Sequence, residues 1–243
     1  MNQFLDILAF AAHPDDVELS CSGTLMKHIE EGKKVGVIDL TEGELGSRGS
    51  VELRYEEADA ASKIMGLTVR ENLKIADGFF EINEENKLKI VKAIRTYKPK
   101  IVLANAVEDR HPDHGRAAQL VSEACFLAGL RKVETIVNGQ LQEAYRPKVV
   151  YHYIQDRYVK PDFVVDMTPF MDRKMEAVKA YKSQFYDPNS TEPQTPISGA
   201  DFLNFVKARC NEFGRPIGAQ YAEGFTVERL VGVESLFDLV YLK

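Results

Sequence analysis

Residues 7–16 read Ile7-Leu8-Ala9-Phe10-Ala11-Ala12-His13-Pro14-Asp15-Asp16, an apolar run that ends abruptly in a polar cluster. The apolar run predicts a buried strand, and the proline predicts a turn at the end of that strand. Two adjacent carboxylates beside an imidazole are costly to bring together unless a positive charge lies near them. A divalent metal ion would supply that charge.

The same arrangement returns later in the chain. The apolar run 101–104 predicts a second buried strand, and His111-Pro112-Asp113-His114 follows it after a loop. Around both strands, segments with strand and helix patterns alternate, which predicts an α/β fold with a mostly parallel sheet flanked by helices. Because ligands bind such sheets beyond the carboxyl ends of the strands, we expect the two His/Asp clusters to form two halves of one metal site.

The remaining elements follow from hydrophobic periodicity and from capping residues. Ser50 is a typical N-cap, and Gly66 and Pro99 each mark the end of a helix. The loop 41–49 is denser in glycine and charge than a tight connection needs, and the loop 187–199 is expected to be a lid or an interface arm. We predict strands over 35–40, 69–73, 149–154 and 163–166, and helices over 23–31, 51–65, 87–97, 116–130, 170–185 and 202–213.

Composition narrows the class of protein. The 243 residues are 44% hydrophobic and 28% charged, which is typical of one globular domain over residues 1–243. The net charge is -6 and the basic residues are scattered, which argues against a nucleic-acid or anionic-membrane partner. Cys21, Cys125 and Cys210 have no metal-type spacing, so a reducing compartment is favoured over a disulfide framework. The chain shows no basic leader and no apolar run of about 18 residues, so we expect it to be cytoplasmic.

Three residues of the two clusters suit a catalytic metal. Such a site takes three His, Asp or Glu ligands and leaves one position to water, as in zinc enzymes. His13, Asp16 and His114 meet this count, because the first two lie three residues apart and the third comes from the distant second motif. This donor set suits one Zn²⁺ per chain and also takes Fe²⁺ or Mn²⁺. The competing interpretation is that each His-Pro-Asp is a plain turn with an Asx cap.

The neighbouring residues suit proton transfer and substrate contact. Asp15 would remain beside the metal without binding it, which suits a general base that takes a proton from water. His111 is placed to stabilise an oxyanion or to protonate a leaving group, and Asp113 to hydrogen-bond His111 and hold it protonated. Arg54 lies in the first turn of a predicted helix, where a cation opposes the helix dipole. This placement indicates an anionic or polar partner, with an exposed arginine as the alternative.

These motifs resemble the zinc-dependent N-acetylglucosaminyl deacetylases of the LmbE/PIG-L type. The resemblance covers most of the chain and rests on HPDD, VIDLTEGELGSRG, ELRYEEADAASKIMG, IADGFF, EDRHPDHGRAA, KSQF and YAEGF. It implies a Rossmann-like α/β fold, zinc at His13, Asp16 and His114, Asp15 as the base and His111, supported by Asp113, as electrostatic partner or acid. It further implies that Glu44 and Asp77 hold sugar hydroxyls and that Arg54 grips the sugar or an anionic aglycone.

One position departs from the pattern of the resemblance. Some relatives carry a tyrosine, as oxyanion donor, two residues before the histidine of the second motif, and this chain has Asp109 there. Tyr221 is the tyrosine that we consider as a substitute donor.

The resemblance also narrows the substrate. GELGSRG with ELR, and YHYIQDRYVKPDFVVD, are similar to the branch that acts in bacillithiol biosynthesis, which removes acetate from N-acetylglucosaminyl malate. A chitooligosaccharide or a thiol conjugate is the alternative substrate. A non-catalytic sugar-binding or nucleotide-binding module is a further alternative, although no G-x-G-x-x-G follows the first strand. The family analogy implies a homo-oligomer, specifically a hexamer.

Overall fold

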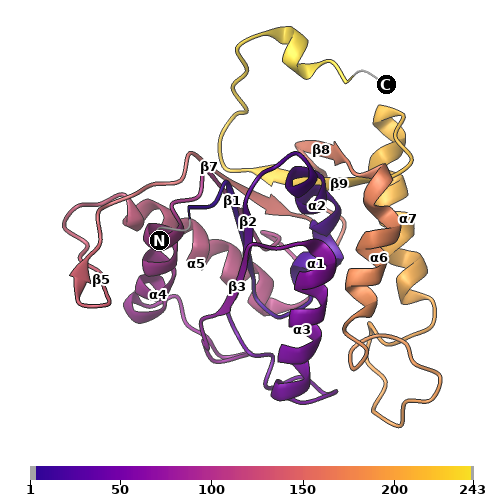
Figure 1. Cartoon of the computed structure of the whole chain (residues 1–243). Coiled ribbons are helices and arrows are strands. Elements are labelled where there is room, and N and C mark those ends of the chain that lie inside the picture. The colour runs from indigo at the N-terminus through magenta and orange to yellow at the C-terminus, as the bar shows by residue number, and fades with distance from the viewer. Residues whose placement is uncertain (1–3, 242–243) are drawn as a thin grey trace.

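A seven-stranded sheet forms the centre of the molecule (Figure 1). The computed structural model describes residues 4–241. The strand order is β3-β2-β1-β4-β7-β9-β8, in which the first five strands are parallel and β9 is antiparallel to both of its neighbours. The mostly parallel sheet predicted above is therefore confirmed. The strands are β1 (Ile7–Ala11), β2 (Val35–Asp39), β3 (Val69–Asn72), β4 (Ile101–Ala104), β7 (Val149–Tyr153), β8 (Phe163–Asp166) and β9 (Ala222–Val227).

Helices cover both faces of this sheet (Figure 1). They are α1 (Asp16–Ser20), α2 (Ser22–Glu30), α3 (Val51–Met65), α4 (Glu84–Tyr97), α5 (Pro112–Ala128), α6 (Met171–Lys179) and α7 (Phe202–Gly214). Short 3-10 turns lie at Thr168–Phe170, Arg215–Ile217 and Leu236–Leu239, and a small hairpin joins β5 (Ile136–Val137) to β6 (Gln140–Leu141). Within residues 4–241, no helix combines the length and the apolarity needed to cross a membrane.

Alternation along β1 divides the core into two layers. Leu8 and Phe10 point to the face that α4 and α5 cover, where they pack with residues such as Val91 and Leu120. Ile7, Ala9 and Ala11 point to the opposite face, which α1, α2, α3 and α6 cover. Because successive side chains of a strand alternate between faces, an uninterrupted apolar run is what a strand buried on both sides requires.

Several elements differ from the sequence prediction. Helix α5 begins at Pro112 rather than near residue 116, because Pro is favoured in the first turn and His111 caps it by accepting the backbone N–H of Asp113. Helix α6 ends at Lys179 rather than at residue 185, because Glu57 binds both the backbone N–H and the hydroxyl of Ser183 and draws the chain aside. Helix α1, strand β9 and the β5–β6 hairpin were not predicted.

A buried ion pair ties the two halves of the chain together beneath the edge where the His/Asp clusters lie. The ammonium of Lys174 in α6 is fully buried and donates to Glu223 of β9 at 2.7 Å and to the carbonyls of Glu18 and Leu19 at 3.0 and 2.8 Å. The Glu223 carboxylate also accepts the backbone N–H groups of Gly23 and Thr24 at the start of α2. This network holds α1, and with it the first His/Asp cluster, against β9.

Lys174→Met is expected to lower the free energy of unfolding by about 3–5 kcal/mol. The substitution leaves the Glu223 carboxylate buried without its cation, and a buried charge that has lost its partner is strongly destabilising. Urea unfolding followed by circular dichroism measures the change. The matched control is Lys63→Met, whose exposed side chain pairs with Asp59 on the surface of α3 and whose loss should cost within about 0.5 kcal/mol. Equal unfolding curves for the two variants would contradict the assignment.

Candidate metal centre

The two His/Asp clusters meet at the carboxyl ends of β1 and β4. These neighbouring strands lie where the strand order reverses, since β1 connects onward to β2 and β3 on one side while β4 lies on the other. Such a switch point is where open α/β sheets bind ligands. Both clusters also begin helices: Asp15 is the N-cap of α1 and His111 is the N-cap of α5. The sequence prediction that the two motifs converge therefore agrees with the structure.

Three imidazoles form the centre of the site. The ring centroids of His13 and His111 lie 4.6 Å apart, those of His111 and His114 5.3 Å apart, and those of His13 and His114 5.6 Å apart. All three rings therefore border one small space above the edge of the sheet.

His13 has a carboxylate on each side of its ring. Its Nε2 lies 3.0 Å from Oδ1 of Asp77, and its Nδ1 lies 3.7 Å from Oδ2 of Asp16. Burial raises the pKa of Asp77, but the contact with His13 and the backbone N–H of Leu45 outweigh it and keep this pKa below its usual value. Asp77 is therefore an ionised partner that fixes the orientation of the imidazole.

His114 also lies between two carboxylates, but its two ring nitrogens have exchanged roles. Its Nδ1 lies 2.6 Å from Oδ2 of Asp109, and its Nε2 lies 3.2 Å from Oδ1 of Asp16. Burial raises the pKa of Asp109, but hydrogen bonds from His114 and from the backbone of Arg157 keep this pKa below its usual value. Each histidine thus has one nitrogen on an outer carboxylate and the other facing Asp16.

Asp16 is held rigidly between the two histidines. Its side chain is 2% exposed, and Oδ2 accepts hydrogen bonds from the backbone N–H of His13 and from Nδ2 of Asn105, both at 2.9 Å. Oδ1 accepts from Nε2 of Gln155 at 2.6 Å. Every one of these contacts leaves the carboxylate ionised and aimed at the two inner nitrogens.

The donor set fits a divalent metal ion. A histidine that binds a metal usually donates its other ring N–H to a carboxylate or carbonyl, and both His13 and His114 have such an outer carboxylate. Within residues 4–241, ligand-type atoms also come within 4.8 Å of one another in two overlapping sets, His13/His111/His114 and His13/Asp77/Asp113. These residues therefore form a candidate His/Asp metal site, and Asp16 and His111 are the two candidates for its third ligand beside His13 and His114.

Asp15 lies beside this site and is almost completely buried. Its side chain has no solvent to stabilise a charge, and burial raises the pKa of Asp15 to about 7. Its backbone has a φ of 118°, a conformation in which Asp and Asn are more common than other non-glycine residues. The cation that faces Asp15 is Arg54, whose Nη1 lies 3.6 Å from Oδ2.

Arg54 does not occupy the exposed position that its place in the helix indicated. The side chain of Arg54 is nearly buried; Nη1 donates to the carbonyl of Pro14 at 2.8 Å and Nη2 donates to Oε1 of Gln184. The guanidinium therefore braces the turn that carries Asp15 rather than facing solvent. Gln184 belongs to the KSQF segment, whose connection to the site the sequence did not predict.

The predicted hydrogen bond between the carboxylate of Asp113 and His111 is wrong. Oδ2 of Asp113 accepts the backbone N–H of Gly78 at 2.8 Å and lies 3.5 Å from Nε2 of His13, and Oδ1 accepts from Arg116 at 3.0 Å. His111 instead uses Nδ1 to accept the backbone N–H of Asp113, so this nitrogen carries no proton. Burial and the neighbouring His13 and His114 lower the pKa of His111. His111 is therefore neutral and has its Nε2–H to donate.

Glu44 and Asp77 also differ from the expected pair of sugar ligands. Both carboxylate oxygens of Asp77 are occupied, one by His13 and the other by the backbone N–H of Leu45 at 3.0 Å. Oε1 of Glu44 accepts the backbone N–H of Asp77 at 2.7 Å, and the rest of this exposed residue faces solvent. The two residues join the loop 41–49 to the loop after β3, and Glu44 is the one that a substrate can reach.

Three residues of the site had no role assigned to them from the sequence. Asn105 directly follows β4, Gln155 follows β7, and Asp109 stood out only because it replaces a tyrosine. The signal available was their position, because polar residues just past the carboxyl ends of central strands face the site. Tyr221 packs against Met167 and its neighbours, and its backbone N–H donates to the hydroxyl of Thr168.

The chain matches one family model and several known proteins. The family model described as GlcNAc-PI de-N-acetylase (PIG-L) matches residues 8–125. The solved structure of a conserved protein from Thermus thermophilus superposes with a TM-score of 0.84 at 37% identity, covering 95% of this chain and 98% of that one. The diacetylchitobiose deacetylase of Thermococcus kodakarensis is 29% identical over 235 residues, which are 92% of this chain and 83% of the relative.

The branch of bacillithiol biosynthesis, to which the sequence segments were compared above, is matched more distantly. The probable N-acetyl-alpha-D-glucosaminyl L-malate deacetylase 2 of Bacillus anthracis is 24% identical over 195 residues, which are 74% of this chain and 81% of the relative. The Thermococcus kodakarensis and Thermus thermophilus relatives thus align over nearly the whole chain, whereas none of these matches singles out one substrate. The His/Asp site at the carboxyl ends of β1 and β4, the matched model and the 37% identical structure together show that the chain belongs to the PIG-L family.

Proposed function

We propose that this protein is a metal-dependent hydrolase that removes acetate from an N-acetylglucosaminyl conjugate. The observation that carries the proposal is the arrangement of the inner nitrogens of His13 and His114 around Asp16, with Asp15 buried beside them. A cation held there would be Zn²⁺, for which two imidazoles and a carboxylate are common ligands, or alternatively Fe²⁺ or Mn²⁺. Membership of a family named for a de-N-acetylase and the diacetylchitobiose deacetylase relative support the reaction type.

Asp15 is the general base of the proposed reaction. A divalent cation, when bound, supplies Lewis acidity that polarises the amide carbonyl and makes a nearby water more acidic. Asp15 takes the proton of the attacking water as the water oxygen bonds to the carbonyl carbon. Burial favours this role, because a carboxylate with a pKa of about 7 binds a proton far more readily than an exposed one. Arg54 keeps the carboxylate in place without neutralising it by a direct hydrogen bond.

His111 is the oxyanion donor and Asp15 returns the proton. The neutral imidazole of His111 holds Nδ1 on the backbone of Asp113, so Nε2–H points away from the helix as a donor for the negative charge that develops on the carbonyl oxygen. The carbon–nitrogen bond then breaks, and the proton held by Asp15 passes to the departing sugar amine. The products are acetate and a glucosamine conjugate.

The conjugate that we propose first is N-acetylglucosaminyl malate. The segments quoted above and the Bacillus anthracis relative support this choice, whereas the Thermococcus kodakarensis relative supports an N-acetylated chitooligosaccharide. Because Arg54 is buried and its guanidinium already donates to Pro14 and Gln184, it is not the cation that we propose for a malate carboxylate.

A substrate panel tests the proposal. The metal-loaded protein is incubated with N-acetylglucosaminyl malate, with N,N′-diacetylchitobiose and with free N-acetylglucosamine, and acetate release is measured with and without a chelator. We expect chelator-sensitive acetate release that is fastest with the malate conjugate. Faster release from diacetylchitobiose would mean that the substrate is a chitooligosaccharide rather than the malate conjugate. The proposed reaction, removal of acetate, would still hold. No acetate release from any of the three, with metal present at one ion per chain, would overturn the proposed function.

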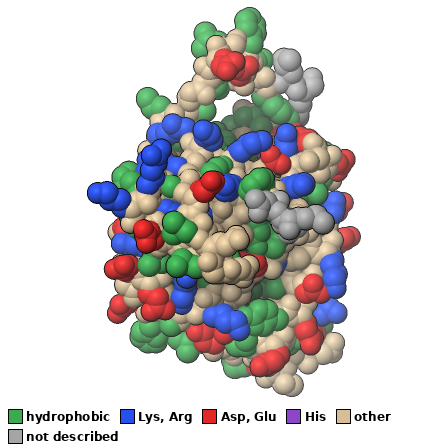
Figure 2. All heavy atoms as spheres, turned by 60° about the vertical axis from the view of Figure 1, so that its left-hand side comes forward, with side chains coloured by type: hydrophobic (Ala, Val, Ile, Leu, Met, Phe, Trp, Pro, Cys, Tyr) green, Lys and Arg blue, Asp and Glu red, His purple; other side chains and the backbone are tan. Residues whose placement is uncertain are grey.

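We also propose that the protein is a homo-oligomer whose contacts involve the C-terminal arm, residues 228–241. Figure 1 shows that the arm stands off the body at the top of the molecule, and Figure 2 shows hydrophobic side chains on this part of the surface. Leu230, Leu236 and Phe237 are 94%, 80% and 84% exposed. Arg229 and Tyr241 tie its two ends to Lys148 and Asp166, so the arm is a closed loop. We propose a second copy of the chain as the partner, because a self-complementary contact between two copies buries the apolar side chains of both arms at once.

Leu236→Glu combined with Phe237→Glu is expected to lower the molar mass of the protein in sedimentation velocity to that of a monomer. Two charges per copy cannot be buried in an apolar contact without a large desolvation penalty. Leu141→Glu is the matched control, since Leu141 is also exposed but lies in β6, away from the arm. An unchanged mass of the double variant, or a monomeric wild type, would contradict the proposed assembly.

A further inference from the structure

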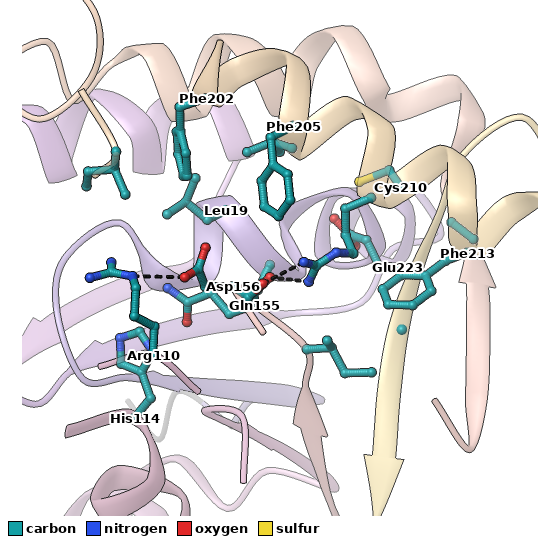
Figure 3. A pocket seen from close by; sticks show the side chains of 17 residues that line it. Leu19, Arg110, His114, Gln155, Asp156, Phe202, Phe205, Cys210, Phe213 and Glu223 are labelled. Carbon is teal, nitrogen blue, oxygen red and sulfur yellow. Dashed lines mark hydrogen bonds and ion pairs between the residues drawn. The ribbon is translucent and has the colours of Figure 1, made fainter. Parts of the chain in front are cut away.

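A pocket extends from His114 beneath α7 (Figure 3). It lies between the end of β7, the start of β9 and the inner side of α7, and its cavity volume is about 40 Å³. His114 and Gln155 border the pocket and also belong to the metal centre, His114 through Nε2 near Asp16 and Gln155 through its bond to Asp16. The pocket is therefore an extension of the active site rather than a separate cavity.

The wall of this pocket is mostly apolar. In Figure 3 the rings of Phe202 and Phe205 project from α7 toward Gln155 and Asp156, with Leu19 beside them and Phe213 at the far end. Ile154, Ile197, Val206, Cys210 and Ala222 complete the apolar lining. A surface of this kind binds hydrocarbon and leaves hydroxyl groups without partners.

Two polar atoms of the pocket lining have no hydrogen-bond partner in the described part of the chain. Among residues 4–241, Oγ of Ser20 and Oε1 of Gln155 are buried without a hydrogen-bond partner, and both residues line the pocket. Ser20 as a whole is more than nine-tenths buried. Buried polar atoms are nearly always paired, so these two atoms indicate that a molecule with a polar group at the metal end enters the pocket.

The opposite rim of the pocket is held in a fixed shape. Arg209 lies over the ring of Phe205, 4.9 Å from its centroid, and donates to the carbonyls of Gln155 and Asp156. The Asp156 carboxylate in turn accepts from Nε of Arg110 at 2.9 Å. The segment after β7 is therefore pinned to α7, and the pocket is formed before a ligand arrives.

From these observations we infer that the pocket binds the acyl chain of the substrate and that the site accepts N-acyl groups longer than acetyl. The inference rests on the proposed function. Acyl chain and amine leave the reacting carbon in different directions, and the sugar hydroxyls need the open, polar side formed by the loop 41–49 and Glu44. The apolar pocket on the His114 side is therefore left for the acyl chain of the substrate. The chemistry is unchanged: water adds to the carbonyl carbon, the carbon–nitrogen bond breaks, and a fatty carboxylate and an amine result.

Direct binding of the product tests the inference without turnover. Acetate, butanoate and hexanoate are titrated into the metal-loaded protein by calorimetry. Each methylene that leaves water adds about fourfold in affinity, so hexanoate is expected to bind more than tenfold tighter than acetate. Equal affinity of the three carboxylates would overturn the inference.

Hydrolysis of an acyl series on one amine is the second measurement. N-acetyl-, N-butanoyl- and N-hexanoylglucosamine are compared by kcat/KM. We expect the hexanoyl compound to be cleaved at least as well as the acetyl compound. A hexanoyl value below a tenth of the acetyl value would overturn the inference and leave the proposed deacetylase intact, whereas failure of all three substrates would overturn the proposed function.

A variant that narrows the pocket distinguishes binding of the acyl chain from binding of the aglycone. Ile197→Trp, in the half-buried loop before α7, is expected to lower the ratio of the hexanoyl to the acetyl kcat/KM at least tenfold. Ile136→Trp, at an exposed position in β5, is the matched control and should leave this ratio unchanged. Octyl N-acetylglucosaminide is included because its apolar group lies on the amine side. If Ile197→Trp impairs cleavage of this compound and not of the hexanoyl amide, the pocket binds the aglycone and the inference is wrong.

Discussion

Asp15→Asn is expected to lower kcat by about 10²–10⁴-fold while the metal content of the protein stays the same. The amide is nearly isosteric with the carboxylate and cannot take a proton from water. Asn is the right replacement, because the φ of 118° at this position suits Asn better than Ala and the turn keeps its shape. Acetate release and zinc content by mass spectrometry are measured on the same sample.

The physical basis of this expectation is the burial of Asp15. Burial raises the pKa of Asp15 to about 7, and Arg54 at 3.6 Å keeps the carboxylate oriented. The control is Asp59→Asn, which removes an exposed carboxylate on α3 that pairs with Lys63 and should leave kcat unchanged. Turnover by Asp15→Asn at near the wild-type rate would show that another group is the base.

Asp16→Asn is expected to abolish metal binding, whereas His111→Asn should retain the ion and lose most of the turnover. Asp16 faces both inner nitrogens, at 3.7 Å for His13 and 3.2 Å for His114, so its charge is central to a His/Asp site. His111 contributes a hydrogen bond to the reacting group in our proposal, and Asn preserves its role as the N-cap of α5. Equilibrium dialysis against Zn²⁺ distinguishes the two variants. An ion retained in Asp16→Asn and lost in His111→Asn would assign the third ligand position to His111.

The outer carboxylates should give an intermediate result in the same dialysis. Asp77→Asn and Asp109→Asn each remove the partner that orients one histidine, at 3.0 Å from His13 and 2.6 Å from His114. Loss of such a partner typically weakens metal affinity by about 10–100-fold. Asp156→Asn is the matched control, because its carboxylate pairs with Arg110 and contacts no histidine within the described part of the chain. Affinity unchanged in both outer variants would contradict the assigned orientation of the two rings.

Local patterns were sufficient for much of the fold. The apolar runs 7–12 and 101–104 predicted β1 and β4. Ser50 and Gly66 cap the two ends of α3 as expected, and the Ser50 side chain accepts the N–H of Leu53. Strand β9 could not be predicted in this way, because its pattern contains Glu223, a charge whose burial is explained only by Lys174 from α6. A pattern based on apolar residues fails where a charge inside the protein has a distant partner.

In the candidate site, too, some residues could be predicted from local sequence and others could not. His13, Asp15, Asp16 and His114 stand next to strand ends in the sequence, and strand ends meet at one edge of a parallel sheet, so their convergence was predictable. The partners of these residues were not. Asp77 lies 64 residues from His13, and Gln155 lies 139 residues from Asp16.

The amino-acid sequence by itself predicted most of the strands and helices, the family and the place where a cation would bind, because each depends on residues that are neighbours along the chain or on periodicity within one element. The tertiary structure alone decided which carboxylate orients which histidine, that Arg54 braces Asp15 instead of facing a substrate, and that α7 closes an apolar pocket beside His114. These contacts depend on how loops from different strands fold over the edge of the sheet, which local composition does not encode.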